Sequence, residues 1–328
     1  MECDSTRVAQ PRVRGLNVKK LPFFIPFQGC GRRCVYCNQN VITGSEKPIA
    51  VNSIRSQIAV QTEPVEICFF GGSFAKLPLS LLIDCLEATR LAPKGSTIRF
   101  STYPTDLLDP KRALLFESYP LSRVELGIPS LDPAVLEAAG REETAEAITE
   151  ALKLLSVRYP LGVQIMTGLP KQSAESSLRD IEHLAQIKGN ATWELRIYPC
   201  LVLEGTALKK LYMEGKYMPP SLEEAVLAAG KLMDTAKQKG FTVIRTGLQS
   251  SKSLERSIIA GPWHPAFGEL AASAALVYGL TRENNAIPWA FPKAEISKFY
   301  GHRRFGLRLL QRVSHLSMET VMERLRFF

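Results

Sequence analysis

Between residues 21 and 248, short apolar runs alternate with longer stretches whose apolar positions recur at helical spacing. Most runs are continuously apolar or β-branched, which is typical of parallel strands covered on both faces. The pattern predicts strands at residues 22–27, 65–70, 97–102, 123–128, 161–168, 193–199 and 242–247. It predicts helices between them at residues 53–62, 79–90, 133–139, 145–158, 176–187 and 222–239.

Strands that alternate with helices build right-handed βαβ units. The fold class that we expect is therefore α/β, with a partial (β/α) barrel of the TIM type. Past Gly247 the alternation stops, and a rigid Pro-flanked loop at 261–265 precedes a helical run at 268–278. Residues 285–328 resemble a small basic α+β tail. We expect a basic N-terminal arm at 1–20, the barrel at 21–250 and an extension at 251–328.

Composition agrees with a globular protein, since 45% of the 328 residues are hydrophobic and 22% are charged. These percentages exclude the disordered and the fibrous classes of protein. The first 15 residues contain no apolar stretch of the secretory kind. The longest weakly polar run, at 270–280, is too short to span a bilayer. We expect a cytoplasmic protein without a membrane partner.

The formal net charge of +9 is concentrated at the two ends. Residues 1–20 hold five Lys or Arg against two acids, and residues 293–328 hold eight against three. Basic ends attract polyanions, with RNA first among them. The alternative is an ordinary solvated helix face, and the sequence leaves both interpretations open.

Three of the seven cysteines fall within eight residues directly after the first predicted strand: Cys30, Cys34 and Cys37. Three thiolates on one loop can each hold one iron of a [4Fe–4S] cube and leave the fourth iron open. A structural zinc site needs four ligands, but the next cysteine is Cys68 and the first histidine is His183. A C-x-x-C redox pair would use only two of the three. Arg32 and Arg33 add positive charge beside the thiolates.

The C-x3-C-x2-C spacing, with Tyr36 just before the last cysteine, resembles the signature of the radical S-adenosylmethionine (SAM) superfamily. The resemblance implies two cofactors, a [4Fe–4S] cluster and SAM, and a reductive cleavage of SAM that starts radical chemistry. It places Tyr36 close to the adenine. Gly71, Gly72 and Ser73 are similar to the family motif whose backbone receives the SAM amino group; a simple tight turn is the alternative.

Within the superfamily, four stretches resemble the branch that contains the catalytic subunit of elongator, which modifies tRNA: residues 100–104, 124–132, 166–170 and 196–202. By this resemblance Glu125 lies near the SAM ribose or methionyl end. Gln164 and Arg196 face inward, and Met166 and Leu169 border the adenine. A strand-end Glu that caps a helix, and an interior Arg that pairs with a core carboxylate, are the alternatives.

The chain departs from that branch at Pro129 and at Ala75-Lys76, and only about 80 residues follow Leu248, too few for an acetyltransferase domain. We expect tRNA or another RNA as the substrate and a flavodoxin- or ferredoxin-type electron donor. The alternatives are a tetrapyrrole-type oxidase acting on a small molecule, since coproporphyrinogen oxidases are more distant relatives, and a non-catalytic iron–sulfur protein that binds RNA.

The tail segment at 296–305 joins basic and aromatic residues and is faintly similar to the glycine–basic loop of KH modules, although the second glycine is missing. A basic surface helix is the alternative. His264 is either a substrate-contacting group or an ordinary loop histidine.

Overall fold

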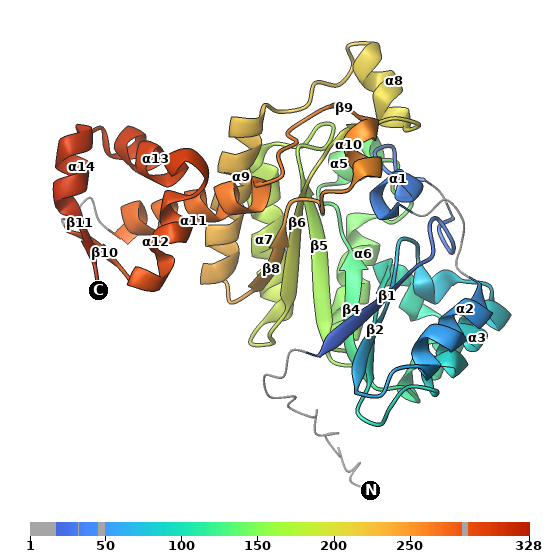
Figure 1. Cartoon of the computed structure of the whole chain (residues 1–328). Helices are drawn as coiled ribbons and strands as arrows, with labels where there is room; N and C mark the ends of the chain where they lie inside the picture. The colour runs from blue at the N-terminus through green and yellow to red at the C-terminus, as the bar shows by residue number, and fades with distance from the viewer. Residues whose placement is uncertain (1–17, 32, 45–49, 284–287) are drawn as a thin grey trace, which may run out of the picture.

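A seven-stranded parallel sheet, curled into part of a barrel, organises the computed structural model, which describes residues 18–31, 33–44, 50–283 and 288–328 (Figure 1). The strands follow the order β1-β2-β3-β4-β5-β6-β8. They are β1 (Lys19–Phe24), β2 (Val65–Phe70), β3 (Thr97–Thr102), β4 (Leu121–Gly127), β5 (Leu161–Thr167), β6 (Glu194–Pro199) and β8 (Thr242–Thr246). β1 and β8 end the order, so within the described chain the sheet does not close. The predicted partial barrel is confirmed.

All seven predicted strands are present; six agree with the predicted bounds to within two residues, and the first is displaced by three. It was expected at 22–27 and runs from Lys19 to Phe24. The prediction carried the strand too far because Phe27 has a positive φ of 58°, which ends extended backbone. The basic arm expected at 1–20 lies outside the described residues except for its last three.

Helices cover the outer face of the sheet: α2 (Val51–Ala59), α3 (Leu79–Thr89), α4 (Pro110–Glu117), α5 (Pro133–Ala138), α6 (Ala145–Ser156), α7 (Ala174–Lys188) and α9 (Leu222–Gln238). One apolar core joins these helices to alternate strand residues, among them Ile98, Phe100 and Ile165. Since alternate residues of a strand face opposite sides, the intervening residues line the concave face.

That concave face is charged, not apolar as the continuous runs had indicated. Arg99 is only 6% exposed. Its guanidinium donates to Glu66 at 3.0 Å, to Glu125 at 2.7 Å and to Glu194 at 2.7 Å. Arg196 donates to the same Glu125 oxygen at 2.7 Å. Buried charges persist where they are paired in this way, and the network fixes the strands of the barrel against one another.

Short elements gather at the carboxyl ends of the strands (Figure 1). They are α1 (Gln39–Thr43), α8 (Ala207–Met213), α10 (Lys252–Ser257) and the antiparallel pair β7 (Val202–Leu203) and β9 (Ile258–Ala260). This end of the sheet is where a barrel of this type carries its function.

The extension is the small α+β unit that we expected, and it lies beyond α9 (Figure 1). Its first helix, α11 (Phe267–Glu283), crosses α9 closely: a Cβ on Gly230 would lie 2.5 Å from that of Ala274. The rest comprises α12 (Ile296–Tyr300), α13 (Phe305–Ser314), α14 (Met318–Arg324) and the parallel pair β10 (Trp289–Phe291) and β11 (Leu325–Phe327). No helix in the described ranges is long and apolar enough to cross a membrane.

Candidate active site

The loop that carries the three cysteines leaves β1 and returns into α1 at the carboxyl end of the sheet. Its first part continues along β2, since the Phe27 amide donates to the Gly71 carbonyl at 3.1 Å. The Ser73 amide in turn donates to the Gln28 carbonyl at 2.8 Å. The cysteine loop and the predicted glycine motif are therefore hydrogen-bonded to each other.

Two glycines let these segments meet backbone to backbone. A Cβ on Gly29 would lie 2.0 Å from the Ser73 carbonyl oxygen, and one on Gly72 would lie 2.3 Å from that of Gln28. No L-side chain fits at either position without moving the backbone. Gly71 turns the chain with a φ of +96°. Gly72 thus seats the cysteine loop, which adds a structural role to the one implied by the resemblance.

The three thiols share one partly buried environment. The Tyr103 hydroxyl lies 3.6 Å from the Cys34 Sγ, and the Gln39 amide donates to the Cys37 Sγ at 3.4 Å. Burial, and then the neighbouring Cys34, raise the pKa of Cys37 to about 12. The same two causes raise the pKa of Cys30. Such thiols become thiolates together only beside a strongly positive centre.

This donor set fits an iron–sulfur cluster. It consists of three soft sulfur ligands on one loop, with no oxygen ligand of the kind that magnesium or calcium requires. Within the described residues, no three Cys, His, Asp or Glu side chains already converge on one point as metal ligands do. Arg32 lies outside the described residues, and the Arg33 guanidinium lies 4.0 Å from the Phe27 ring centroid.

A buried network of hydroxyl groups and one carboxylate lies next to the cysteine loop and the glycine motif. The Asp106 carboxylate accepts from Ser73 and from the Thr102 hydroxyl, the latter at 2.9 Å. The Ser73 Oγ also accepts from the Tyr103 amide at 3.1 Å. These bonds occupy the Ser73 side chain and place Tyr103 against Cys34.

Arg141 is a site residue that the sequence did not reveal. It is buried and donates to the Gly127 carbonyl at 2.8 Å, and it forms an ion pair with Glu143. Its Nη1 lies 4.0 Å from the Cys34 Sγ, and its Nε has no partner among the described residues. A fixed positive charge therefore lies beside the cysteine loop.

Tyr36 and Met166, both placed near the adenine by the resemblance, pack against the same group of apolar residues, and their contact with the adenine stays a prediction. Both contact a small apolar cluster that contains Leu169, Cys200 and Tyr217. The segment around Tyr36 is fixed on two sides, because the Val35 amide donates to Ala139 at 3.0 Å and the Val35 carbonyl accepts from Leu208 at 2.8 Å. The result is an apolar cluster that packs the segment around Tyr36 against the ends of β5 and β6.

Glu125, Gln164 and Arg196 form a second group, on the concave face. The Gln164 amide and the Arg196 guanidinium donate to the Glu125 carboxylate at 2.8 and 2.7 Å, and Glu125 is only 2% exposed. Arg196 is thus an interior arginine paired with the core carboxylate of Glu125, as in the alternative given in the sequence analysis. A contact of the three with SAM stays a prediction.

Two family models match the chain. A model described as the radical SAM superfamily matches residues 24–184, and one described as the radical SAM C-terminal domain matches residues 192–276. Together they cover about three quarters of the sequence. The first contains the cysteine loop and the glycine motif, and the second begins at β6 and ends inside α11.

Curated relatives match over part of their length. Mouse "Radical S-adenosyl methionine domain-containing protein 1, mitochondrial" is 26% identical over 264 residues, 74% of this chain and 57% of that protein. "Elongator complex protein 3" of Drosophila melanogaster is 29% identical and is matched over 58% of this chain and 43% of that protein. A "tRNA uridine(34) acetyltransferase" of Methanocaldococcus jannaschii is 31% identical over 32% of this chain and 20% of that protein. The chain thus spans about half the length of the mouse and fly relatives.

Solved structures share the fold. Elp3 of the archaeon Methanocaldococcus infernus superposes with a TM-score of 0.56 at 20% identity, covering 77% of this chain and 61% of that one. Streptococcus suis SuiB bound to S-adenosylmethionine gives a TM-score of 0.51 at 13% identity, covering 72% and 51%. At these identities the likeness concerns architecture alone.

Proposed function

The chain belongs to the radical SAM superfamily, and from this membership and the site described above we propose that it modifies tRNA or another RNA by radical chemistry. It is an enzyme, and its cofactors are a [4Fe–4S] cluster and SAM. When bound, these cofactors supply a reactive radical that removes a hydrogen atom from the substrate or adds to it.

The residues of the chain have separable tasks in this proposal. Cys30, Cys34 and Cys37 would hold the cluster and leave one iron for SAM. The backbone of Gly71 and Gly72 would receive the SAM amino group, as the resemblance implies, while the missing Gly72 side chain leaves room for the Gln28 carbonyl. The apolar surface of Tyr36, Met166 and Leu169 would take the adenine and keep water away from the reacting atoms.

Arg141 and Tyr103 would set the electrostatics. Thiolates and sulfides make the cluster anionic, and the buried Arg141 guanidinium offsets part of that charge without rearranging. A flavodoxin- or ferredoxin-type protein would supply the electron. The six described cysteines are free thiols, which fits the reducing cytoplasm where we expect the enzyme to act.

Charge and relatives together support an RNA substrate. The formal net charge is +9, and the exposed cations of the extension provide the attraction that RNA binding needs. Two relatives are named for an activity on tRNA uridine(34), and they match 32% and 58% of this chain. The acetyl transfer in that name is not part of the proposal, because the match covers 20% of the M. jannaschii protein.

Two measurements test the proposal in sequence. Anaerobic reconstitution followed by dithionite and SAM should release 5′-deoxyadenosine, whereas a non-catalytic iron–sulfur protein would not. Mass spectrometry of nucleosides from tRNA of a deletion strain should then show one modified nucleoside missing. Release of 5′-deoxyadenosine with an unchanged nucleoside profile would favour a small-molecule substrate instead.

A further inference from the structure

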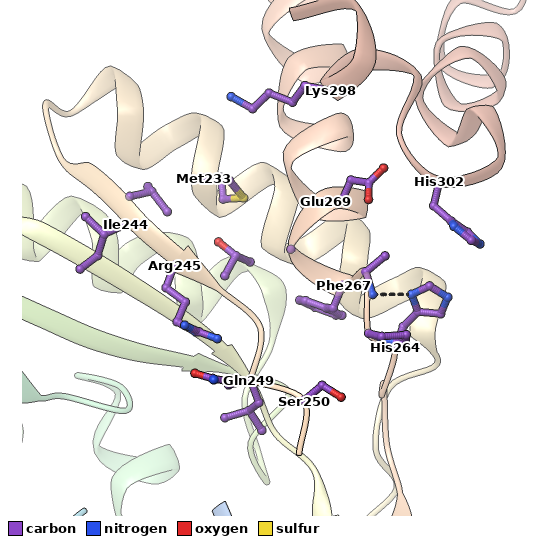
Figure 2. A pocket seen from close by; sticks show the side chains of 16 residues that line it. Met233, Ile244, Arg245, Gln249, Ser250, His264, Phe267, Glu269, Lys298 and His302 are labelled. Atoms are coloured by element: carbon purple, nitrogen blue, oxygen red, sulfur yellow. Dashed lines mark hydrogen bonds between the residues drawn. The ribbon is translucent and has the colours of Figure 1, made fainter. Parts of the chain in front are cut away.

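A cavity of about 920 Å³, lined by both polar and apolar side chains, lies at the open edge of the barrel. One wall is β8 with the segment at 248–250 that follows it, and the others come from α9, the loop at 264–266 with the start of α11, and α12 with the turn after it (Figure 2). It therefore lies where the last strand has no neighbour and the extension begins. Its polar lining includes the charged or ring side chains Arg245, His264, Glu269, Lys298 and His302.

Two histidines from separate segments meet at this cavity. The rings of His264 and His302 lie 5.0 Å apart between centroids and are inclined by 61° (Figure 2). The His264 Nδ1 accepts from the Ala266 amide at 3.0 Å. In the neutral ring the proton is therefore on Nε2, which makes that nitrogen a hydrogen-bond donor.

The backbone next to His302 is held in an unfavourable conformation. Arg303 and Arg304 both have left-handed angles, with φ of 52° and 57°. L-residues other than Asn and Asp rarely adopt this region, and two in succession are rarer still. Both side chains are exposed, so burial of apolar surface by these side chains does not explain why the strain is retained.

Packing underneath enforces the turn. A Cβ on Gly306 would lie 2.0 Å from the Phe299 carbonyl oxygen, and the buried Ser273 hydroxyl donates to the same oxygen at 2.6 Å. The Arg308 guanidinium donates to the Arg303 carbonyl at 2.7 Å. Strain of this kind is concentrated at sites that bind ligands.

The charges around the turn select an anion. Lys298, Arg303, Arg304 and Arg308 are all exposed. Two acids stand against these four cations: Glu269 lies in the cavity, and the Glu295 carboxylate is 3.9 Å from the Lys298 amine. The balance of charge around the turn is therefore positive. Guanidinium groups and imidazole N–H groups are suited to phosphate oxygens.

The cavity is also linked to the cysteine loop. Leu248, in its wall, contacts a small apolar cluster that includes Leu254 and is also contacted by Val41 and Ile42 of α1. The Ser253 hydroxyl donates to the Val41 carbonyl at 3.0 Å. The wall is thus packed against the helix that follows Cys37.

We propose that the cavity, together with the turn at 301–304, binds the phosphodiester backbone of the RNA substrate and presents that RNA at the open edge of the barrel. The inference rests on the proposed function. It assigns RNA binding to the extension, and it assigns His264 and His302 as residues that contact phosphate groups.

The test uses the full-length protein and a fluorescein-labelled tRNA transcript, with affinity measured by fluorescence anisotropy over a series of salt concentrations. In the variant Arg303→Gly/Arg304→Gly, two charges are lost while glycine accepts the left-handed backbone without strain. We expect about tenfold weaker binding, and a slope of log affinity against log salt reduced by about 1 per lost contact. The melting temperature should be equal to or above that of the unaltered protein, because the strain is relieved.

Lys153→Gln/Lys239→Gln is the matched control, since it removes two exposed charges from α6 and from the end of α9. A second pair, Lys298→Gln/His302→Gln, leaves Arg303 and Arg304 in place and should weaken binding similarly even if the glycine pair fails to fold. If the unaltered protein binds tRNA and both cavity pairs match the control, the cavity inference is overturned and the proposed function stands. If the unaltered protein does not retain tRNA at low salt, both are overturned.

Discussion

The guanidinium carbon of Arg141 lies 3.7 Å from the centroid of the Tyr103 ring. The two residues come from different connections, one after α5 and one after β3, and both lie against Cys34. The cation fixes the aromatic ring, and the ring keeps the cation desolvated. The cysteine loop therefore rests on a support whose parts are far apart in sequence.

Removing Arg141 should destabilise the fold strongly. Arg141→Met leaves Glu143 buried without its ionic partner, and breaking a buried pair in this way costs about 3–5 kcal/mol. Urea unfolding measures the loss. Arg158→Met is the control, because it breaks an exposed pair with Glu117 and should cost less than about 1 kcal/mol. Equal losses in the two variants would show that the Arg141 pair contributes no more than a surface pair.

Gly29→Ala should prevent the cysteine loop from packing against the backbone of the glycine motif. The added methyl group would lie 2.0 Å from the Ser73 carbonyl, so one of the two backbones must move. We expect a loss of most of the iron after anaerobic reconstitution. Gly215→Ala is matched in backbone angle, with φ of 69° against 75°, and has open space around its Cβ. It should keep its iron; if both variants lose iron equally, backbone strain rather than the close contact is responsible.

Substitution of the clustered cysteines should abolish cluster assembly selectively. Cys30→Ala/Cys34→Ala/Cys37→Ala should take up no iron, whereas the unaltered protein should take up about four per chain. Cys68→Ala/Cys85→Ala removes two buried cysteines of the core and should retain the cluster absorbance. Zinc uptake by the unaltered protein under the same conditions would contradict the assignment.

Stability should depend on pH through Asp180. Burial raises the pKa of this carboxyl to about 6, against the hydrogen bonds from Ser130 and Leu131. Because the folded state holds the proton more tightly than the unfolded state, the contribution is full below pH 4 and is lost as the pH rises through 6. The expected loss is about 3 kcal/mol. Asp180→Asn should flatten this part of the stability curve, and parallel curves for the two proteins would refute the assignment.

The barrel was predictable because its strands are apolar runs bounded by turn residues, and local pattern suffices to find them. The β7–β9 pair was not, since Val202 and Leu203 pair with residues nearly 60 positions later. Helix α4 was missed although its signal is present: Asp109 caps it and Pro110 begins it. This helix has only eight residues and lies between two strands with much stronger patterns, so its own pattern is weak by comparison.

In the candidate site, too, residues close in sequence were predictable and residues brought together from distant segments were not. The three cysteines and Tyr36 are adjacent in sequence, so spacing alone groups them. Arg141 lies 104 positions after Cys37 and follows an ordinary helix end at Gly140, so no local pattern marks it. The pairing of Arg99 with Glu66 and Glu194 was hidden too, because each is a single charge next to apolar residues and only the curl of the sheet brings them together.

At the crossing of α9 and α11, Gly230 has no side chain, and the Ala274 methyl group occupies the space beside it. Two helices that meet at a glycine and an alanine approach closely, and a rotation of either would press larger side chains into the contact. The extension is therefore held against α9, at the edge of the barrel. We therefore expect a bulky polymer to meet the turn at 301–304 in a fixed position relative to the barrel.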